Sequence, residues 1–362
     1  MKIEHWNDKE IKQACSFTEL CNKIYEKLDW EEDFDLSYLQ NPNDFVEWQS
    51  TLRKKFIKLI KIPDRKRKEE CIVIAESTSK NIHSFKKYET EMIYIKSWFE
   101  TLIPAIICIP KLERADDLPA FICLHGHLMR KENLVGLRKN LIYSGTWAKD
   151  LAELGCITIT ADQWGFGERG HARKSVKKNY DHLERKYALN MLILGHTISG
   201  LRIYDTMQQV DYLLSREDVD SSKIGVAGLS MGGTIASYTA AIDIRISMAI
   251  VAGFCSTFKS SILEKQHCTD NYVPKILKYG ELGKILSLVA PRPLFFINGV
   301  KDPIFPIESA IHTYNELRKI YELLGKTENL GIDVTPYGHK WKGNKVYEFV
   351  KKKWLDVSFL SN

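Results

Sequence analysis

The distribution of apolar residues divides the chain into a helical N-terminal segment and a larger region in which strands and helices alternate. Apolar side chains recur at three- and four-residue spacing over 11–28 and again over 44–62, which predicts two amphipathic helices. Pro63 marks the end of the second helix. We therefore expect residues 1–85 to form a helical extension that packs on the rest of the protein, covers its entrance, or mediates self-association.

From residue 86 onward, short and mostly unbroken apolar runs predict strands that are buried on both faces. These runs lie at 92–95, 102–109, 120–124, 156–161, 224–227, 246–252, 293–298 and 331–335. The first two should pair antiparallel through a tight connection at 98–101. Helical stretches separate most of the others, including 146–154, 187–214 and 234–241. The alternation predicts an α/β domain over 86–362, with a mostly parallel sheet covered by helices on both faces. An irregular, partly helical insert at 253–292 is a candidate wall of a substrate pocket.

The apolar run at 224–227 leads directly into GLSMG at 228–232, a match to the G-x-S-x-G pattern. Small, helix-compatible residues follow, so the motif has the strand–turn–helix context of a nucleophile elbow. In such an elbow the serine adopts a strained backbone conformation between glycines, and its hydroxyl is exposed above the sheet. Ser230 is therefore the candidate nucleophile. An ordinary glycine-rich turn is the alternative.

A serine hydroxyl needs a general base, and that base needs a carboxylate to orient it. In this class of fold the chain order is serine, acid and then histidine, each after a strand. Asp302 follows the run at 293–298, and His339 follows the run at 331–335. Both therefore fall at the carboxyl edge of the predicted sheet, where catalytic groups gather. The alternatives are a turn-forming aspartate and a surface-loop histidine.

Other histidines and aspartates match these two roles less well. His196 and His312 fall in predicted helices, whereas His267 and Asp270 lie in the insert. Asp333 lies inside the last predicted strand. We therefore retain Asp302 and His339 as the acid and the base.

Acyl-transfer chemistry also needs hydrogen-bond donors for the oxyanion. One donor is expected to be the backbone N–H of Met231, the residue after the nucleophile, and the other that of His127, after the strand 120–124. The side chain of His125 is expected to be a structural hydrogen-bonding group. His125-x-His127 resembles a metal-ligand pair, but the oxyanion loop explains it better, and we expect no metal and no cofactor.

The loop DQWGFGERG at 162–170 adds polar and aromatic residues near this edge. Asp162 and Arg169 either pair near the site or hold the long loop together, and the second interpretation is preferred. Trp164 and Phe166 either line an acyl pocket or pack the loop.

Composition is that of an ordinary globular protein, with 44% hydrophobic and 27% charged residues among 362. The N-terminus lacks the pattern of a secretory signal, and no apolar run reaches membrane-spanning length. The eight cysteines have no CxxC spacing, which favours reduced thiols and a cytoplasmic location. The net charge of +6 comes largely from 53–68 and 173–186, expected to be solvated basic surface. No nucleic-acid or membrane partner is expected.

The motifs GLSMGG, HGH, DQWGFGERG, NYVPKILKYGELGKI, APRPLFFINGVKDPIFP and YGHKW, in their order and spacing, resemble the α/β-hydrolase superfamily. Within it the chain is most similar to esterases related to acetyl xylan esterases and to dienelactone-hydrolase-like proteins. The resemblance runs from about residue 87 to the C-terminus. It implies a serine esterase with Ser230, Asp302 and His339 as the triad. Dienelactone hydrolases use a cysteine nucleophile, so the serine argues against that particular activity.

These patterns predict a serine carboxylesterase that hydrolyses a small-molecule ester, with a short acyl or acetyl group, through an acyl-enzyme. The same groups would also serve an amide, a thioester, a carbon–carbon bond or acyl transfer. A non-catalytic protein that retains the hydrolase scaffold is a third interpretation, and we leave self-association open.

Overall fold

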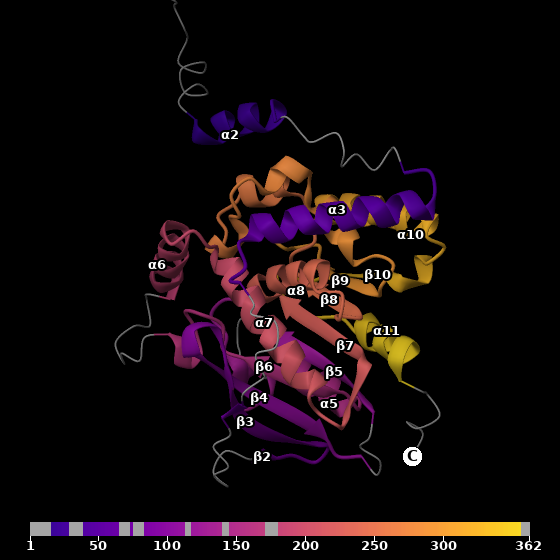
Figure 1. Cartoon of the computed structure of the whole chain (residues 1–362). Coiled ribbons are helices and arrows are strands. Elements are labelled where there is room, and N and C mark those ends of the chain that lie inside the picture. The colour runs from indigo at the N-terminus through magenta and orange to yellow at the C-terminus, as the bar shows by residue number, and fades with distance from the viewer. Residues whose placement is uncertain are drawn as a thin grey trace, which may run out of the picture.

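A large, strongly twisted sheet organises the protein (Figure 1). The structure is a computed structural model that describes residues 16–28, 39–64, 73–74, 83–112, 117–139, 145–170 and 180–355. Ten strands form the sheet within these residues, in the order β1-β3-β4-β6-β5-β7-β8-β9-β10, with β2 paired to β3. Their bounds are β1 Val73–Ile74, β2 His83–Ser84, β3 Tyr88–Lys96, β4 Leu102–Pro110, β5 Leu118–Leu124, β6 Ile157–Ala161, β7 Val219–Leu229, β8 Met248–Ala252, β9 Leu294–Gly299 and β10 Leu330–Thr335.

The sheet is antiparallel at its start and parallel through its centre. Strands β3 and β4 form the predicted hairpin, and β4 also pairs antiparallel with β6. From β6 through β5, β7, β8, β9 and β10 every pairing is parallel. The loops that follow β5, β7, β9 and β10 therefore meet at one edge, as ligand sites of open α/β sheets do.

Helices cover both faces of the sheet (Figure 1). The helices are α2 Phe17–Glu26, α3 Pro42–Ile60, α4 Lys131–Leu134, α5 Trp147–Glu153, α6 Tyr180–Ile193, α7 Ile198–Leu214, α8 Met231–Ile242, α9 Leu282–Leu286, α10 Ile307–Leu323 and α11 Lys345–Trp354. Alternate residues of the buried strands point to opposite sides. One core joins the sheet to α3, α7, α8, α9 and α10, and a second core joins it to α4, α5 and α11. The predicted α/β-hydrolase architecture is confirmed.

Helix α3 contributes directly to the first core. Its apolar stripe is almost completely buried, with Phe56 packed edge-to-face on Tyr238 of α8 at 5.3 Å between ring centroids. On the neighbouring face, the Gln49 amide donates to the carbonyl of Ala290 (2.6 Å), and the Arg53 guanidinium donates to that of Ala241 (2.9 Å). The helix thus supplies donors to carbonyl groups at the ends of α8 and of the insert.

The prediction of helices throughout 1–85 is wrong for two short segments. Val73–Ile74 and His83–Ser84 are strands that pair antiparallel with β3, which extends the sheet at that edge. The expectation for residues 11–15, like the rest of 1–15, lies outside the described residues.

The single helix predicted over 187–214 is also wrong, because the chain breaks there into α6 and α7. Gly195 adopts a left-handed conformation (φ 84°), which ends the first helix. Thr197 then caps the second helix by accepting a hydrogen bond from the N–H of Gly200 (2.9 Å). The break lets α7 run along the sheet while α6 turns away from it (Figure 1).

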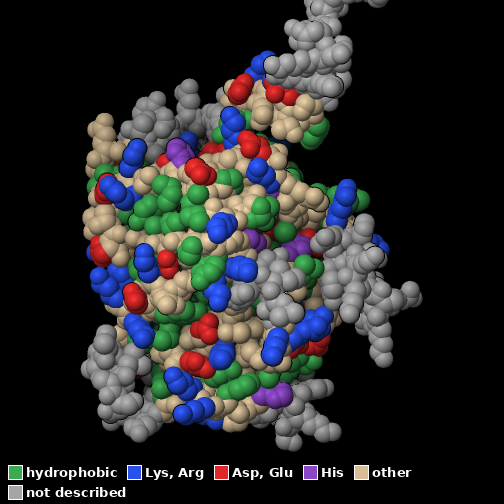
Figure 2. Space-filling view, turned by 180° about the vertical axis from the view of Figure 1, so that it is seen from behind, with side chains coloured by type: hydrophobic (Ala, Val, Ile, Leu, Met, Phe, Trp, Pro, Cys, Tyr) green, Lys and Arg blue, Asp and Glu red, His purple; other side chains and the backbone are tan. Residues whose placement is uncertain are grey.

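Charged side chains are dispersed over the surface. Figure 2 shows Lys and Arg intermingled with acidic and apolar side chains on the rear face. Among the helices that the structure describes, none combines the length and the apolar character needed to cross a membrane. Of the basic segment 173–186, residues 173–179 lie outside the described residues, and the remainder forms the start of α6.

Candidate active site

Ser230 occupies the sharp turn between β7 and α8. Its backbone has φ 58° and ψ −123°, a strained conformation for a non-glycine residue, and its side chain is buried. The flanking glycines permit the turn, because a Cβ on Gly228 would lie 2.1 Å from the carbonyl oxygen of Gly232. A Cβ on Gly232 would in turn lie 2.1 Å from the carbonyl oxygen of Leu124. The predicted strained turn between glycines is confirmed, whereas the predicted exposure of the serine hydroxyl is wrong, because the side chain is buried.

Asp302 and His339 lie in direct contact although 37 residues separate them. Nδ1 of His339 is 2.6 Å from Oδ2 of Asp302. The other carboxylate oxygen accepts hydrogen bonds from the backbone N–H groups of Ile304 (3.0 Å) and Phe305 (3.1 Å). The Phe305 ring also stacks on the imidazole, with centroids 5.5 Å apart. The imidazole is therefore held from two sides, and its second nitrogen faces away from the carboxylate.

The end of β8 brings this pair towards the elbow. The N–H of Ser230 donates to the carbonyl of Ala252 (2.9 Å), and the next residue is Gly253. A Cβ on Gly253 would lie only 2.7 Å from Cε1 of His339 and 3.3 Å from the side chain of Leu229. The imidazole therefore packs on backbone that is hydrogen-bonded to the nucleophile turn. The structure brings the loops of all three predicted triad residues together.

The loop after β5 passes beside Ser230. A Cβ on Gly126 would lie 3.5 Å from Cβ of Ser230. His125 is completely buried, and its Nε2 accepts a hydrogen bond from the N–H of Gln163 (3.1 Å). Burial lowers the pKa of His125 to about 4, so the ring is neutral at pH 7. Its surroundings match the structural role predicted from sequence.

The side chain of His127 makes contacts that sequence reasoning missed. Nε2 lies 2.9 Å from a carboxylate oxygen of Glu184, and Nδ1 lies 2.9 Å from Sγ of Cys268. The ring also packs edge-to-face on Phe166. Burial disfavours its charged form, but the hydrogen bond and charge of Glu184 outweigh burial and raise the pKa of His127.

Arg202 lies behind this histidine, fully buried at the start of α7. Its Nη1 is 3.2 Å from Glu184 and 3.6 Å from Asp270, and its Nη2 donates to the carbonyl of Trp164 (2.9 Å). Both acidic partners come from segments that look like ordinary polar connections in the sequence. A fully buried charge of this kind persists only with such partners.

The loop at 162–170 is held by ion pairs, but Asp162 and Arg169 do not pair with each other. Asp162 contacts the ammonium of Lys131 at 2.7 Å, and Arg169 contacts Asp205 at 2.6 Å. The Arg169 guanidinium also lies over the ring of Trp164 at 3.9 Å. The interpretation that the two residues hold the loop is confirmed, and the suggestion of a direct pair is wrong.

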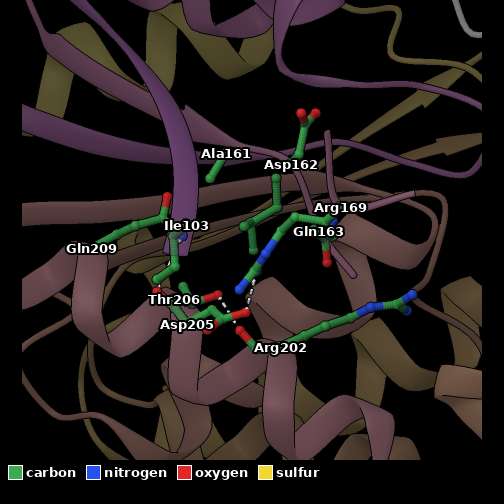
Figure 3. Close-up of a pocket in the computed structure, with 10 residues that line it drawn as sticks. Ile103, Ala161, Asp162, Gln163, Arg169, Arg202, Asp205, Thr206 and Gln209 are labelled. Atoms are coloured by element: carbon green, nitrogen blue, oxygen red, sulfur yellow. Dashed lines mark hydrogen bonds and ion pairs between the residues drawn. The ribbon is translucent and has the colours of Figure 1, made fainter. Parts of the chain in front are cut away.

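A small polar cavity lies beneath this loop (Figure 3). Arg169 points towards Asp205 there, whereas the guanidinium of Arg202 points away from that carboxylate (Figure 3). The residues that line the cavity include none of the three triad candidates. The cavity therefore belongs to the scaffold that supports the loops rather than to the reacting groups.

The three competing histidines and Asp333 contact other groups. His196 lies 3.1 Å from the carbonyl of Lys61, and His312 is exposed beside Glu316. His267 contacts the hydroxyl of Ser261 at 2.9 Å. The carboxylate of Asp333 accepts from the N–H of Lys345 (3.4 Å), well along the last strand.

The fold and the elbow define an α/β-hydrolase, and the sequence assigns the chain within that class. The profile of the Abhydrolase family matches residues 8–333, so the chain belongs to this family. YtaP of Bacillus subtilis (strain 168), which is named as a hydrolase, is 31% identical over 265 residues. That match covers 70% of this chain and 83% of YtaP. The predicted resemblance is confirmed.

Solved structures share the fold at low sequence identity. A protein of Bacteroides fragilis NCTC 9343 described as an acetyl xylan esterase superposes with a TM-score of 0.73 at 17% identity, covering 95% of this chain and 91% of that one. A glucuronoyl esterase from Solibacter usitatus superposes with a TM-score of 0.62 at 13% identity, covering 91% and 99%. These likenesses establish the architecture.

Proposed function

We propose that this protein is a serine carboxylesterase that hydrolyses a small-molecule ester with a short acyl or acetyl group. Ser230 is the nucleophile, His339 the general base and Asp302 the carboxylate that orients it. The observation that carries the proposal is the 2.6 Å contact between His339 and Asp302, held against the strained turn that presents Ser230. Packing alone does not require these three residue types at three strand ends.

In the proposed reaction, Oγ of Ser230 attacks the ester carbonyl while Nε2 of His339 takes the hydroxyl proton. Asp302 keeps the proton on Nδ1 and stabilises the imidazolium that forms. The backbone N–H groups of Met231 and His127 donate to the oxyanion of the tetrahedral intermediate. The C–O bond then breaks, and the alcohol leaves with the proton from His339. Water, deprotonated by the same imidazole, cleaves the acyl-enzyme to a carboxylic acid and restores the serine.

Two observations from the comparisons support an ester as the substrate. The chain belongs to a hydrolase family, and structures with the same architecture are named for acetyl xylan and glucuronoyl esters. The burial of the Ser230 side chain suits a compact acyl group. Thioesters, amides and acyl transfer remain the competing chemistries, because the same oxyanion hole serves them.

A fluorophosphonate probe tests the nucleophile. We expect it to label Ser230 alone, and Ser230→Ala to lose both labelling and hydrolysis of p-nitrophenyl acetate. Ser237→Ala on the same helix is the matched control, since that hydroxyl bonds to the carbonyl of Gly233. Full activity in Ser230→Ala would refute the proposal.

The acid and the bond type need separate measurements. Asp302→Asn should lower kcat by about 10⁴-fold, because the imidazole loses its correct tautomer. A near-normal rate would exclude Asp302 as the orienting acid. Comparing p-nitrophenyl esters of graded chain length with a matched anilide and thioester should show preference for the shortest esters. Faster turnover of the anilide or thioester would reassign the reaction.

A further inference from the structure

A cluster of potential metal ligands lies beside the elbow, and its side chains have no part in the proposed reaction. His127, Cys268 and Asp270 each offer one ligand atom, and these atoms lie within 4.8 Å of one another. His127 comes from the loop after β5, whereas the other two flank the start of a short 3₁₀ turn, Thr269–Asn271, in the insert. The cluster therefore joins two loops that are distant in sequence.

The donor set is one that zinc prefers. Imidazole nitrogen, thiolate sulfur and carboxylate oxygen bind Zn²⁺ at about 2.0–2.3 Å, which places ligand atoms of a tetrahedral site about 3.5 Å apart. Nδ1 of His127 and Sγ of Cys268 are already 2.9 Å apart. Changes of up to about 1.3 Å in the separations between ligand atoms would bring the set to coordination distance. Three protein ligands leave the fourth position to water.

The carboxylate of Asp270 supplies independent evidence that a ligand belongs here. Its side chain is fully buried, and neither oxygen accepts a hydrogen bond from any residue that the structure describes. Nη1 of Arg202 lies 3.6 Å from Oδ1 of Asp270, beyond hydrogen-bond distance. Burying a carboxylate without hydrogen-bond donors costs free energy, and a divalent cation bound to Asp270 would offset its negative charge.

The surroundings also match those of a bound metal. Glu184 lies 2.9 Å from Nε2 of His127 and accepts the hydrogen bond there, so Nδ1, which faces Sγ of Cys268, is the nitrogen that would ligate. Metal-binding histidines usually make this contact with a carboxylate. The charges balance as well: a dication and Arg202 match the thiolate and the two carboxylates of Glu184 and Asp270.

We propose that His127, Cys268 and Asp270 bind a divalent cation of the zinc class, with Glu184 orienting the histidine. The ion would tie the insert to the loop beside the nucleophile. The same turn is already linked to α8, because the hydroxyl of Thr234 donates to the side chain of Asn271 (2.9 Å). This site goes beyond the proposed esterase activity, and its test requires no substrate.

The test is direct metal binding to the full-length, untagged protein. After treatment with a chelator, titration with Zn²⁺ against a chromophoric competitor should give one ion per chain. Cys268→Ser and Asp270→Asn should each weaken binding at least tenfold. Cys21→Ser and Asp333→Asn are matched controls that change the same residue types outside the cluster, and they should bind as the wild type does.

Two measurements on the unaltered chain keep the test decisive if a variant fails to fold. Co²⁺ should produce a thiolate-to-metal charge-transfer band in the near ultraviolet. Zn²⁺ should slow alkylation of Cys268 at least tenfold without slowing that of Cys21. Absence of stoichiometric binding, unchanged affinity in Cys268→Ser, or alkylation indifferent to Zn²⁺ would overturn the proposal and leave a metal-free Cys268–His127 pair. Ser230→Ala should bind zinc normally, which separates this test from that of the esterase.

Discussion

Replacing Lys131 with methionine should destabilise the protein strongly. Lys131 is completely buried, and its ammonium lies 2.7 Å from Asp162, whose side chain is equally buried. It also contacts Glu168, but that side chain is 43% exposed and can turn to solvent. Methionine preserves the apolar stem and removes the charge. Among the described residues, Asp162 then keeps two backbone donors, the N–H groups of residue 131 (3.0 Å) and Glu168 (2.9 Å).

The expected loss in the free energy of unfolding is about 3–5 kcal/mol, the usual cost of stranding one member of a buried ion pair. Lys149→Met is the matched control, because that lysine is half-exposed and makes a long contact of 3.8 Å with Glu153, one helical turn away. It should lose less than about 1 kcal/mol. Urea unfolding followed by circular dichroism measures both.

The pH dependence of the stability loss distinguishes removal of the ion pair from a simple loss of packing. Burial alone would raise the pKa of Asp162, but the charge of Lys131 outweighs it and lowers the pKa. The pair therefore stabilises the wild type above the ordinary aspartate pKa, and this contribution is lost as the pH falls through the lower folded-state value. In Lys131→Met the pKa of Asp162 should rise instead. The loss in the free energy of unfolding of Lys131→Met should therefore become smaller as the pH is lowered from 7 to 5. Adding Asp162→Asn to Lys131→Met should restore part of the lost stability. A loss no larger than that of Lys149→Met, or one independent of pH, would refute the reasoning.

Two further substitutions test the packing around the site. Gly253→Ala should lower kcat/KM for p-nitrophenyl acetate about 10²-fold, because the new methyl group displaces the His339 ring. Gly325→Ala has the same left-handed strain with open space around it, so it should leave kcat/KM unchanged; equal rates for both variants would contradict the prediction. Phe56→Ala should lower the free energy of unfolding by about 3–5 kcal/mol, because the ring is completely buried. Ile57→Ala, at a half-exposed position, should lower it by less than about 1 kcal/mol. Equal losses in urea unfolding would argue against a core role for α3.

The elbow and the contact between Asp302 and His339 were predictable because their signals are local. Ser230 follows an apolar strand and is flanked by glycines, and Asp302 and His339 come directly after buried runs. The parallel pairing of β7, β8, β9 and β10 then places these strand ends together. A pattern confined to a strand and the loop after it is enough to predict such a site, because parallel pairing brings these loops to one edge of the sheet.

The buried charges behind the site were not predictable in this way. Glu184 and Arg202 lie on helices, where a charged residue ordinarily indicates a solvent-facing position. Helix α7 is buried on nearly all sides, so its polar residues carry no periodic signal. The break before it did have a signal, since Gly195 and Thr197 have the spacing of a helix end followed by a cap. The pairing of Cys268 with His127 depends on an irregular insert that no periodicity describes.

The docking of α3 has a consequence for biosynthesis. Tyr238, on whose ring Phe56 packs, is translated 182 residues after Phe56. At about 5–20 residues per second, this helix waits about 10–40 s with its apolar stripe uncovered. The amino-terminal part of the chain thus completes its tertiary contacts after much of the catalytic sheet has been translated, and nascent-chain chaperones have a defined interval in which to bind it.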